Sequence, residues 1–496
     1  MRAPSRSLGP LKPLLGAATL TALAACSFAP KYETPAVPVG DRYKEAAEPT
    51  ADGTWSPATP ADHLPRGRWW MLYGDAALNE LVDRMTRNSP DLAAALARYD
   101  EAAAYRDEAH AALLPSFSLS GKVERDKSSD LQPPSGSYPP YYGSNSLGIA
   151  GSYELDLWGR VRNAVKAGDA SFAAAGSDLE SARLALQAEL VDDYIQLRGL
   201  DIENQLLQDT VVAYQKALDL TQSRRTAGIA SGLDVAQART QLHAAKAQVS
   251  TTAAQRAVLE HAIAVLVGES PSTFAIAPRT DKLQVPDIPT DVPASLLQRR
   301  PDVAAAERRT AAANASVGVA RAAWFPTFSL TGSVGYASYE RTDWFKASNL
   351  FWAAGPSVAF NLFNGGLREA QVRQARAALD EAGANYRSIA LTAFAQVEDD
   401  LALLSRYRTA AADQAEAVDA AQKSVDYAMT RYREGAANYL QVTTAQAAAL
   451  STQRDSVSLD TNRLRASVAL IRALGGGWSA GDGKAPQTAT VARNAP

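Results

Sequence analysis

The feature that most constrains this chain is the absence of proline from two long stretches, residues 141–270 and 357–485. Proline breaks a helix because its ring fills the place of a backbone N–H group. Without it, residues 160–227 and 366–434 are each predicted to form one helix of about 70 residues, on the order of 100 Å long. Helices of globular domains are far shorter, so the chain is predicted to be mainly α-helical and elongated.

Apolar residues in the first of these helices follow a coiled-coil spacing of threes, fours and sevens. Asp193 and Asn204 take two of the positions that the pattern skips. A seam of this kind pairs helices side by side. The apolar positions are Leu186, Leu190, Leu197, Leu200, Leu207, Val211, Tyr214 and Leu218.

The sequence also contains an internal duplication. Residues 114–121 (LPSFSLSG) recur as 325–332 (FPTFSLTG), and residues 228–235 recur as 435–442. The repeats predict two copies of one unit, at 66–267 and 301–475, joined by a proline-rich linker at 268–300. Each unit is expected to contain a helix, a strand, a loop, a strand, a very long helix, a turn and a helix.

The predicted strands have one apolar and one polar face. Around Leu119 and Leu330, apolar and polar side chains alternate with a period of two. Each alternating segment is about ten residues long, the length of a tilted strand that crosses a bilayer. A soluble sheet with one buried face fits the same pattern. The loops at 125–143 and 337–350 are expected to face outside. The apolar stripes are Phe117, Leu119, Gly121 and Val123; Leu147, Ile149, Tyr153, Leu155 and Leu157; Phe328, Leu330, Val334 and Tyr336; and Val358, Phe360 and Leu362.

Four membrane strands cannot close a barrel, and an open edge in lipid leaves unpaired backbone groups. The chain is therefore expected to oligomerise, and three copies would supply about twelve strands around a polar lumen. The fold class predicted from the sequence is mainly α with a membrane β-barrel portion, formed by a trimer that also builds a periplasmic α-helical barrel.

The amino terminus resembles a bacterial lipoprotein signal peptide, with basic residues before a short apolar run. Residues 1–25 are the predicted signal peptide, and residues 23–26 (LAAC) resemble a lipobox. Cys26, the one cysteine of the chain, would carry covalent diacylglycerol and palmitate. Ser27, rather than aspartate, favours the outer membrane. Residues 26–65 are predicted to be a lipid-anchored, proline-rich linker, and residues 476–496 a disordered tail.

Composition argues against other classes. The formal net charge is −3, from 50 basic and 53 acidic side chains, so the chain carries no electrostatic signature of nucleic-acid binding. The four histidines lack metal-ligand spacing. No convergent catalytic or metal site is expected, and no cofactor other than the lipid at Cys26.

Four further segments are similar to the outer-membrane efflux proteins of the TolC and OprM type, particularly the NodT-like lipoproteins. The resemblance covers nearly all of the mature chain. It implies a homotrimer with a twelve-stranded barrel, a helical barrel and an equatorial belt, with residues 268–300 as the equatorial linker. It also implies a periplasmic adaptor, an inner-membrane pump of the RND type, and a role in multidrug resistance. The segments are 69–75 (WWMLYGD), 153–160 (YELDLWGR), 299–303 (RRPDV) and 362–366 (LFNGG).

Two helix hairpins are the expected periplasmic tip. Gly228 and Gly435 are predicted to end the long helices. In the family the second turn often carries carboxylates, but Gln441 and Thr444 stand at the matching positions here. We expect Leu440 to seal the resting tip, with interhelical packing as the alternative role. An acidic ring would then come from Asp234 of the first hairpin.

Glycines are expected at the points where strand becomes helix: Gly159, and the pair Gly365 and Gly366. The function predicted from the sequence is a passive outer-membrane duct that conducts small molecules, such as drugs, from adaptor and pump to the exterior. Two alternatives remain at this stage. One is a duct for protein secretion, and the other is a structural coiled-coil lipoprotein of the periplasm.

Overall fold

The structure is a computed structural model that describes residues 28–38, 43–45, 66–127, 129, 141–286, 288, 300–339 and 343–476. The signal peptide at 1–25, Cys26, most of the first linker, residues 287 and 289–299 of the second, and the tail from 477 lie outside the described residues. The elements, in chain order, are η1 (Arg66–Tyr73), α2 (Ala76–Asn88), α3 (Pro90–Ala111), β1 (Ser116–Lys127), β2 (Tyr141–Leu155), α4 (Arg160–Thr226), α5 (Gly232–Leu266), α7 (Pro301–Ala322), β3 (Thr327–Ser338), η2 (Ala347–Asn349), β4 (Leu350–Ala359), α8 (Leu367–Arg433) and α9 (Tyr439–Ala473).

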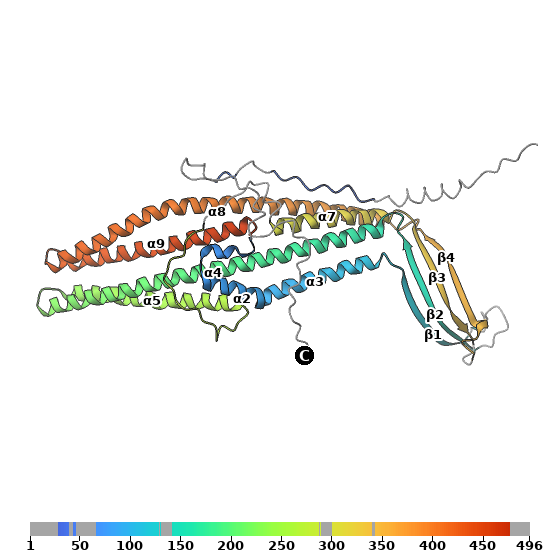
Figure 1. The fold of residues 1–496 in the computed structure, drawn as a ribbon, viewed down its shortest axis with the longest axis horizontal. Coiled ribbons are helices and arrows are strands. Elements are labelled where there is room, and N and C mark those ends of the chain that lie inside the picture. The colour runs from blue at the N-terminus through green and yellow to red at the C-terminus, as the bar shows by residue number, and fades with distance from the viewer. Residues whose placement is uncertain are drawn as a thin grey trace, which may run out of the picture. The chain divides into compact units, whose positions relative to one another are not determined.

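The two halves contain helices of the same length. Helices α4 and α8 each have 67 residues, and helices α5 and α9 each have 35. The predicted bounds of the long helices agree with these elements to within a residue. Figure 1 shows each long helix followed by its shorter return helix. Among the described residues, none of the helices is both long enough and apolar enough to cross a membrane.

The chain divides into two compact units, which are described separately. The first unit comprises residues 1–35, 100–175 and 306–386, and the second comprises 36–99, 176–305 and 387–496. The first unit holds a four-stranded antiparallel sheet with the order β1-β2-β3-β4. Each strand therefore pairs with its neighbour in sequence, as in a meander.

The strand bounds correct two sequence predictions. The predicted loop at 125–143 is shorter, because Arg125 pairs with Gly143 and Lys127 with Tyr141 at the end of the β1-β2 hairpin. In the other hairpin, strand β4 ends at Ala359. Phe360 and Leu362 therefore do not belong to the strand, although their spacing continues its alternation, and Leu157 likewise lies beyond β2.

The second unit has its hydrophobic core around η1, α2 and parts of α4, α5 and α9. Tyr194, Leu190 and Leu197 of α4 are fully buried there. A buried ion pair lies beside this core: Nη1 of Arg198 is 2.6 Å from Oδ2 of Asp75. Asp75 also caps α2, because its side chain accepts hydrogen bonds from the backbone N–H groups of Ala77 and Leu78. One carboxylate thus ties the start of α2 to α4.

Candidate functional site

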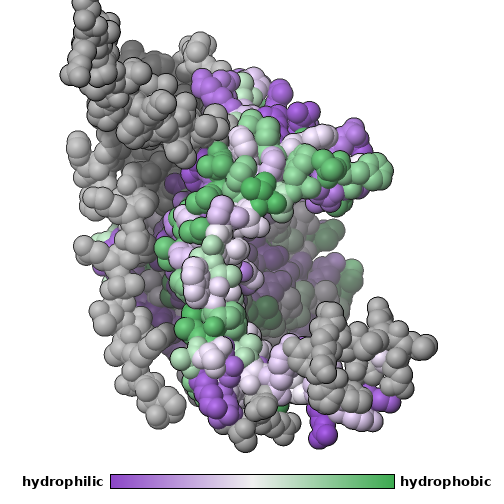
Figure 2. Space-filling view, turned by 90° about the vertical axis from the view of Figure 1, so that its right-hand side faces the viewer, coloured by the Kyte–Doolittle hydropathy of each residue, from purple (hydrophilic) through white to green (hydrophobic). Residues whose placement is uncertain are grey.

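One face of the sheet is apolar from edge to edge. Leu119 pairs with Ile149, Ile149 with Val334, and Val334 with Trp352, so the four side chains form one row across the strands. Their exposed fractions are 71%, 50%, 47% and 75%. Figure 2 shows patches of hydrophobic residues among pale and hydrophilic ones on the described surface. An apolar surface of this extent in one subunit marks a contact with lipid or another protein.

The opposite face carries small and hydroxyl side chains. The row beside the apolar one consists of Ser118, Ala150, Ser333 and Ala353. This face is hollowed by a cavity of about 410 Å³, lined by Ser116, Ser118, Ala150, Gly151, Ser152, Thr331, Gly332, Ser333, Ala353, Ala354 and Gly355. The alternation predicted from the sequence is therefore present across all four strands, with hydroxyl groups toward the hollow.

The outer strands of the sheet leave two edges. Strands β1 and β4 each pair with a single strand within the described residues. They have 12 and 10 residues respectively. An edge of this length exposes a row of backbone N–H and C=O groups.

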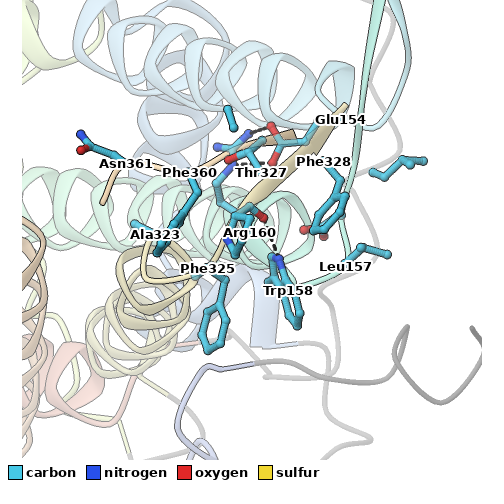
Figure 3. A pocket seen from close by; sticks show the side chains of 15 residues that line it. Glu154, Leu157, Trp158, Arg160, Ala323, Phe325, Thr327, Phe328, Phe360 and Asn361 are labelled. Carbon is cyan, nitrogen blue, oxygen red and sulfur yellow. Dashed lines mark hydrogen bonds and ion pairs between the residues drawn. The ribbon is translucent and has the colours of Figure 1, made fainter. Parts of the chain in front are cut away.

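The first strand-to-helix junction is a polar and aromatic corner between β2 and α4. Gly159 has φ +77°, which a residue with a side chain rarely adopts. Nε1–H of Trp158 donates to the backbone oxygen of Pro326 over 2.8 Å, and Arg160 pairs with Glu154. Figure 3 shows these groups around a cavity of about 500 Å³. The contacts join the end of β2 to the start of β3.

The second junction, between β4 and α8, uses the glycine pair. Gly365 has φ +62° and Gly366 has φ +86°. Arg368, in the first turn of α8, donates to the backbone oxygen of Asn361 and lies over the rings of Trp324 and Phe360, at 5.6 and 5.3 Å. The three glycines expected at the junctions therefore all have the left-handed backbone that a side chain would strain.

The two hairpin turns of the second unit have the same backbone design. Gly228 has φ +74° and Gly435 has φ +78°. After Gly228, the N–H of Ile229 donates to the carbonyl of Arg224, and after Gly435 the N–H of Ala436 donates to the carbonyl of Arg431. These bonds satisfy the last carbonyl groups of α4 and α8.

The residues predicted at the tip are distributed around the second turn. Leu440 is 54% exposed, at the second position of α9. The backbone N–H of Gln441 donates to Oδ1 of the cap residue Asn438, and Oγ1 of Thr444 donates to the carbonyl of Leu440. Both hydrogen bonds therefore lie at the amino-terminal end of α9 and stabilise the start of that helix.

Asp234 of the first hairpin takes part in a capping box. Its carboxylate accepts the backbone N–H of Ser231 over 2.8 Å, and its own N–H donates to the hydroxyl of Ser231. The carboxylate is thus held at the amino terminus of α5, where the helix dipole favours a negative charge.

An aromatic pair that the sequence analysis did not select lies in the second hairpin, and an arginine of the first hairpin contacts it. The ring of Tyr432 meets that of Tyr439 edge to face at 5.2 Å, and Arg224 lies 4.8 Å over Tyr432. Arg224 also donates to the carbonyl of Arg433 over 3.0 Å. Burial raises the pKa of the Tyr439 hydroxyl to about 12. The only signal in the sequence was a pair of tyrosines on either side of the glycine turn.

A second feature that the sequence analysis did not identify is a pair of aspartates with raised pKa values, at matching positions in α4 and α8. Burial raises the pKa of Asp193 to about 6, and Asp192 adds to the rise. Burial and the neighbouring Asp399 likewise raise the pKa of Asp400 to about 7. Within the described residues, no group of three or more His, Cys, Asp and Glu side chains could hold a metal ion.

A two-faced, four-stranded sheet whose outer strands are unpaired within the described residues, and whose second and fourth strands each lead into a helix of 67 residues, defines a wall segment of an outer-membrane channel. The sequence profile of the outer membrane efflux protein family matches residues 81–269 and 292–476. The chain belongs to this family. It is an outer-membrane efflux protein that reaches into the periplasm, and this membership favours efflux over a secretion duct or a structural lipoprotein.

Individual relatives cover nearly the whole chain. The outer membrane protein OprJ of Pseudomonas aeruginosa is 32% identical over 477 residues, 95% of this chain and 97% of its own length. The toluene efflux pump outer membrane protein TtgF of Pseudomonas putida is 32% identical over 471 residues, 94% of this chain and 96% of its own. The solved structure of the outer-membrane channel OprN has a TM-score of 0.82 and 30% identity, over 91% of this chain and all of its own.

Proposed function

We propose that three copies of this chain close a channel in the outer membrane, each contributing four strands to a twelve-stranded wall. The observation that carries this proposal is the pair of free edges, β1 and β4, on a sheet with an exposed apolar face. In lipid each unpaired backbone group costs several kcal/mol. Pairing β1 of one copy with β4 of the next removes every such edge when the ring closes.

In this trimer the hollowed face lines the lumen. Its small hydroxyl and glycine residues leave space and offer weak, exchangeable hydrogen bonds, which suits the passage of small molecules. The wall needs no catalytic group and no cofactor, so the chain acts as a conduit and not as an enzyme. The apolar face contacts the bilayer.

We further propose that Cys26 carries diacylglycerol and palmitate and anchors the subunit at the strand-to-helix junction. Phe28, two residues later, stacks on Phe325 with ring centres 4.4 Å apart, and lies 6.4 Å from Trp158. Because two residues reach at most about 7 Å, acyl chains on Cys26 would enter the membrane beside this corner. Several acyl chains make the attachment durable.

The helix hairpins of the second unit are the proposed docking site for a periplasmic adaptor, which links the channel to an inner-membrane pump of the RND type. We propose that Leu440, with its exposed side chain, closes the resting tip as a ring of three. Asp234 is proposed to give the acidic ring nearby. Apolar constrictions of this kind close a pore by dewetting.

The cargo is proposed to be hydrophobic drugs and solvents. TtgF is named for a toluene efflux pump, and the relative ArpC of Pseudomonas putida, 31% identical over 482 residues, for an antibiotic efflux pump. The chemistry of the polar face is compatible with such cargo because it offers no fixed charge along the row from Ser118 to Ala353.

The test is to purify the acylated chain and record single channels in planar bilayers. We expect heat-modifiable trimers on gels, a mass at Cys26 increased by the lipid, and KCl conductance. A Cys26→Ser variant should lose the lipid mass but stay in the membrane after high-salt washing, because the strands still span the bilayer. A water-soluble monomer without conductance would contradict the channel, and a non-acylated native protein would contradict the anchor.

A further inference from the structure

Phe351 is an aromatic side chain on the polar face of the sheet. It pairs with Gly335 of β3, and Gly335 pairs with Gly148 of β2, which in turn pairs with Ser120 of β1. The row beside it, from Ser118 to Ala353, lines the hollow. Phe351 therefore stands at the border of that hollow, at the second position of β4, near the loop end of the sheet.

The tip of the ring lies close to two glycines, one on each of the two neighbouring strands. A β-carbon at Gly335 would lie 2.9 Å from Cζ of Phe351, and one at Gly148 would lie 3.3 Å from the same atom. Real β-carbons essentially never come as close as 2.9 Å, and a contact of 3.3 Å is tighter than most, so a side chain at either glycine would crowd the ring; at Gly335 the neighbouring strand backbone also excludes one. Phe351 is nevertheless 38% exposed, so part of the ring is available to a molecule in the hollow.

The neighbouring residue gives the contrast. Trp352 belongs to the apolar face and is 75% exposed. It needs no special explanation in a wall that contacts lipid, where aromatic residues are common. An aromatic ring among small and hydroxyl residues does call for an explanation, because a polar side chain at this position would be equally compatible with a water-filled lumen.

We propose that Phe351 is a contact site for aromatic and other planar apolar molecules that pass along the polar face, and so a residue that influences cargo residence in the channel. The proposal rests on the proposed trimeric channel. The hollow beside the ring, about 410 Å³, has the size of a small-molecule site. A cargo molecule can stack on the exposed part of the ring while hydroxyl groups of the adjacent row contact its polar atoms.

The lysine and glutamate of β1 add a polar boundary on the loop side. Nζ of Lys122 lies 2.7 Å from Oε2 of Glu124, two residues further along the same face. Because their charges are paired, they favour neither cations nor anions strongly. Phe351 therefore selects molecules by the shape of their apolar part rather than by their net charge.

The experiment uses purified trimers in planar bilayers, with 1-naphthylmethylammonium as the aromatic probe and an aliphatic ammonium of similar size as its control. Residence of the naphthyl probe is read from transient blocks of the KCl current. We expect Phe351→Leu to shorten this residence roughly two- to tenfold, the range of one aromatic contact. The aliphatic probe and the KCl conductance should be unchanged. Trp352→Leu is the matched control on the other face and should leave both probes unchanged.

A second pair of variants tests the role of the glycines. Gly148→Ala should displace the ring from the wall and lower the KCl conductance, and the double variant with Phe351→Leu should restore the part of the conductance that the displaced ring blocks. Conducting channels in which Phe351→Leu leaves the naphthyl residence unaltered would overturn the contact site alone. Wild-type protein that forms no conducting channel would contradict the channel itself, and the site with it.

Discussion

Replacing Ile149 by arginine should destabilise the protein far more than the same change at the next residue, Ala150. Ile149 lies near the middle of β2, on the apolar face, whereas Ala150 lies on the polar face. The two residues are adjacent and lie at nearly the same depth in the membrane, so a difference between the variants reflects the face on which the arginine lies. It therefore tests directly which side of the sheet meets lipid.

The magnitude follows from the geometry of the strand. Strand β2 has 15 residues, about 50 Å at 3.4 Å per residue, and a tilt of about 40° reduces its height to about 39 Å. Ile149, eight residues from one end and six from the other, then lies well inside an apolar band of about 25 Å. An arginine at such a depth costs about 2–4 kcal/mol on the lipid face, a factor of roughly 30 to 700 in the folded-to-unfolded ratio.

The assay is guanidinium denaturation of protein inserted in phospholipid vesicles, followed by tryptophan fluorescence. The Ile149→Arg variant should lose about 2–4 kcal/mol of unfolding free energy. The Ala150→Arg variant should lose less than about 1 kcal/mol, because its side chain remains in water, and it should shift ion selectivity toward anions. Equal losses in the two variants, or a larger loss for Ala150→Arg, would refute the assignment of the faces.

Three further predictions concern the second unit. Leu440→Ser should raise the resting KCl leak of trimers in planar bilayers, and an unchanged leak would leave Leu440 a packing residue. Asp193→Asn should stabilise the protein at pH 8, because the pKa of Asp193 is raised to about 6 and its ionisation above that pH opposes folding. This gain in stability should fade as the pH decreases from 6 toward the ordinary pKa of 3.8. A gain that does not change with pH would contradict the raised pKa as its cause. Asp75→Asn should cost about 3 kcal/mol of unfolding free energy, because Arg198 loses its buried carboxylate partner and keeps only the exposed Asp281. A loss below about 1 kcal/mol on denaturation would argue against that pair.

The long helices and their ends could be predicted closely because their determinants are local. Proline is absent throughout, and Gly228 and Gly435 supply the left-handed residue that ends each helix. The alternation in the strands is also local, since successive side chains point to opposite faces. The identity of each face thus followed from the order of residues alone.

Strand ends and partners could not be predicted in the same way. The pairing of Arg125 with Gly143 lengthens the first hairpin although neither residue favours a strand, because the preceding pairs already fix the register. At the other end of the sheet, Phe360 continues the alternation of β4 but belongs to the junction cavity. The alternation of apolar and polar residues therefore does not show where the hydrogen bonding between strands ends.

Contacts between distant segments were beyond the sequence analysis altogether. Asp75 and Arg198 are separated by 123 residues, and only the packing of α2 against α4 brings them together. The placement of Phe351 over two glycines likewise depends on the register of three strands. In both cases the residue itself is of a common type, and only the fold determines which residue lies next to it.

The most direct test of the central claim is disulfide cross-linking between the free edges of neighbouring copies. The native chain has one cysteine, which acylation would block. A cysteine at Ala353 in β4 can be combined in turn with one at Ser116, Ser118 or Ser120 in β1. Within one copy β1 and β4 are three strand spacings apart, about 14 Å, too far for a disulfide.

We expect oxidation to give covalent dimers and trimers in outer membranes for at least one of these pairs, which would also define the register of the joined strands. Single-cysteine controls at each position should remain monomeric on denaturing gels. If no combination along β1 forms a cross-link in the membrane, while the protein is folded and inserted, the closed three-copy wall would be contradicted.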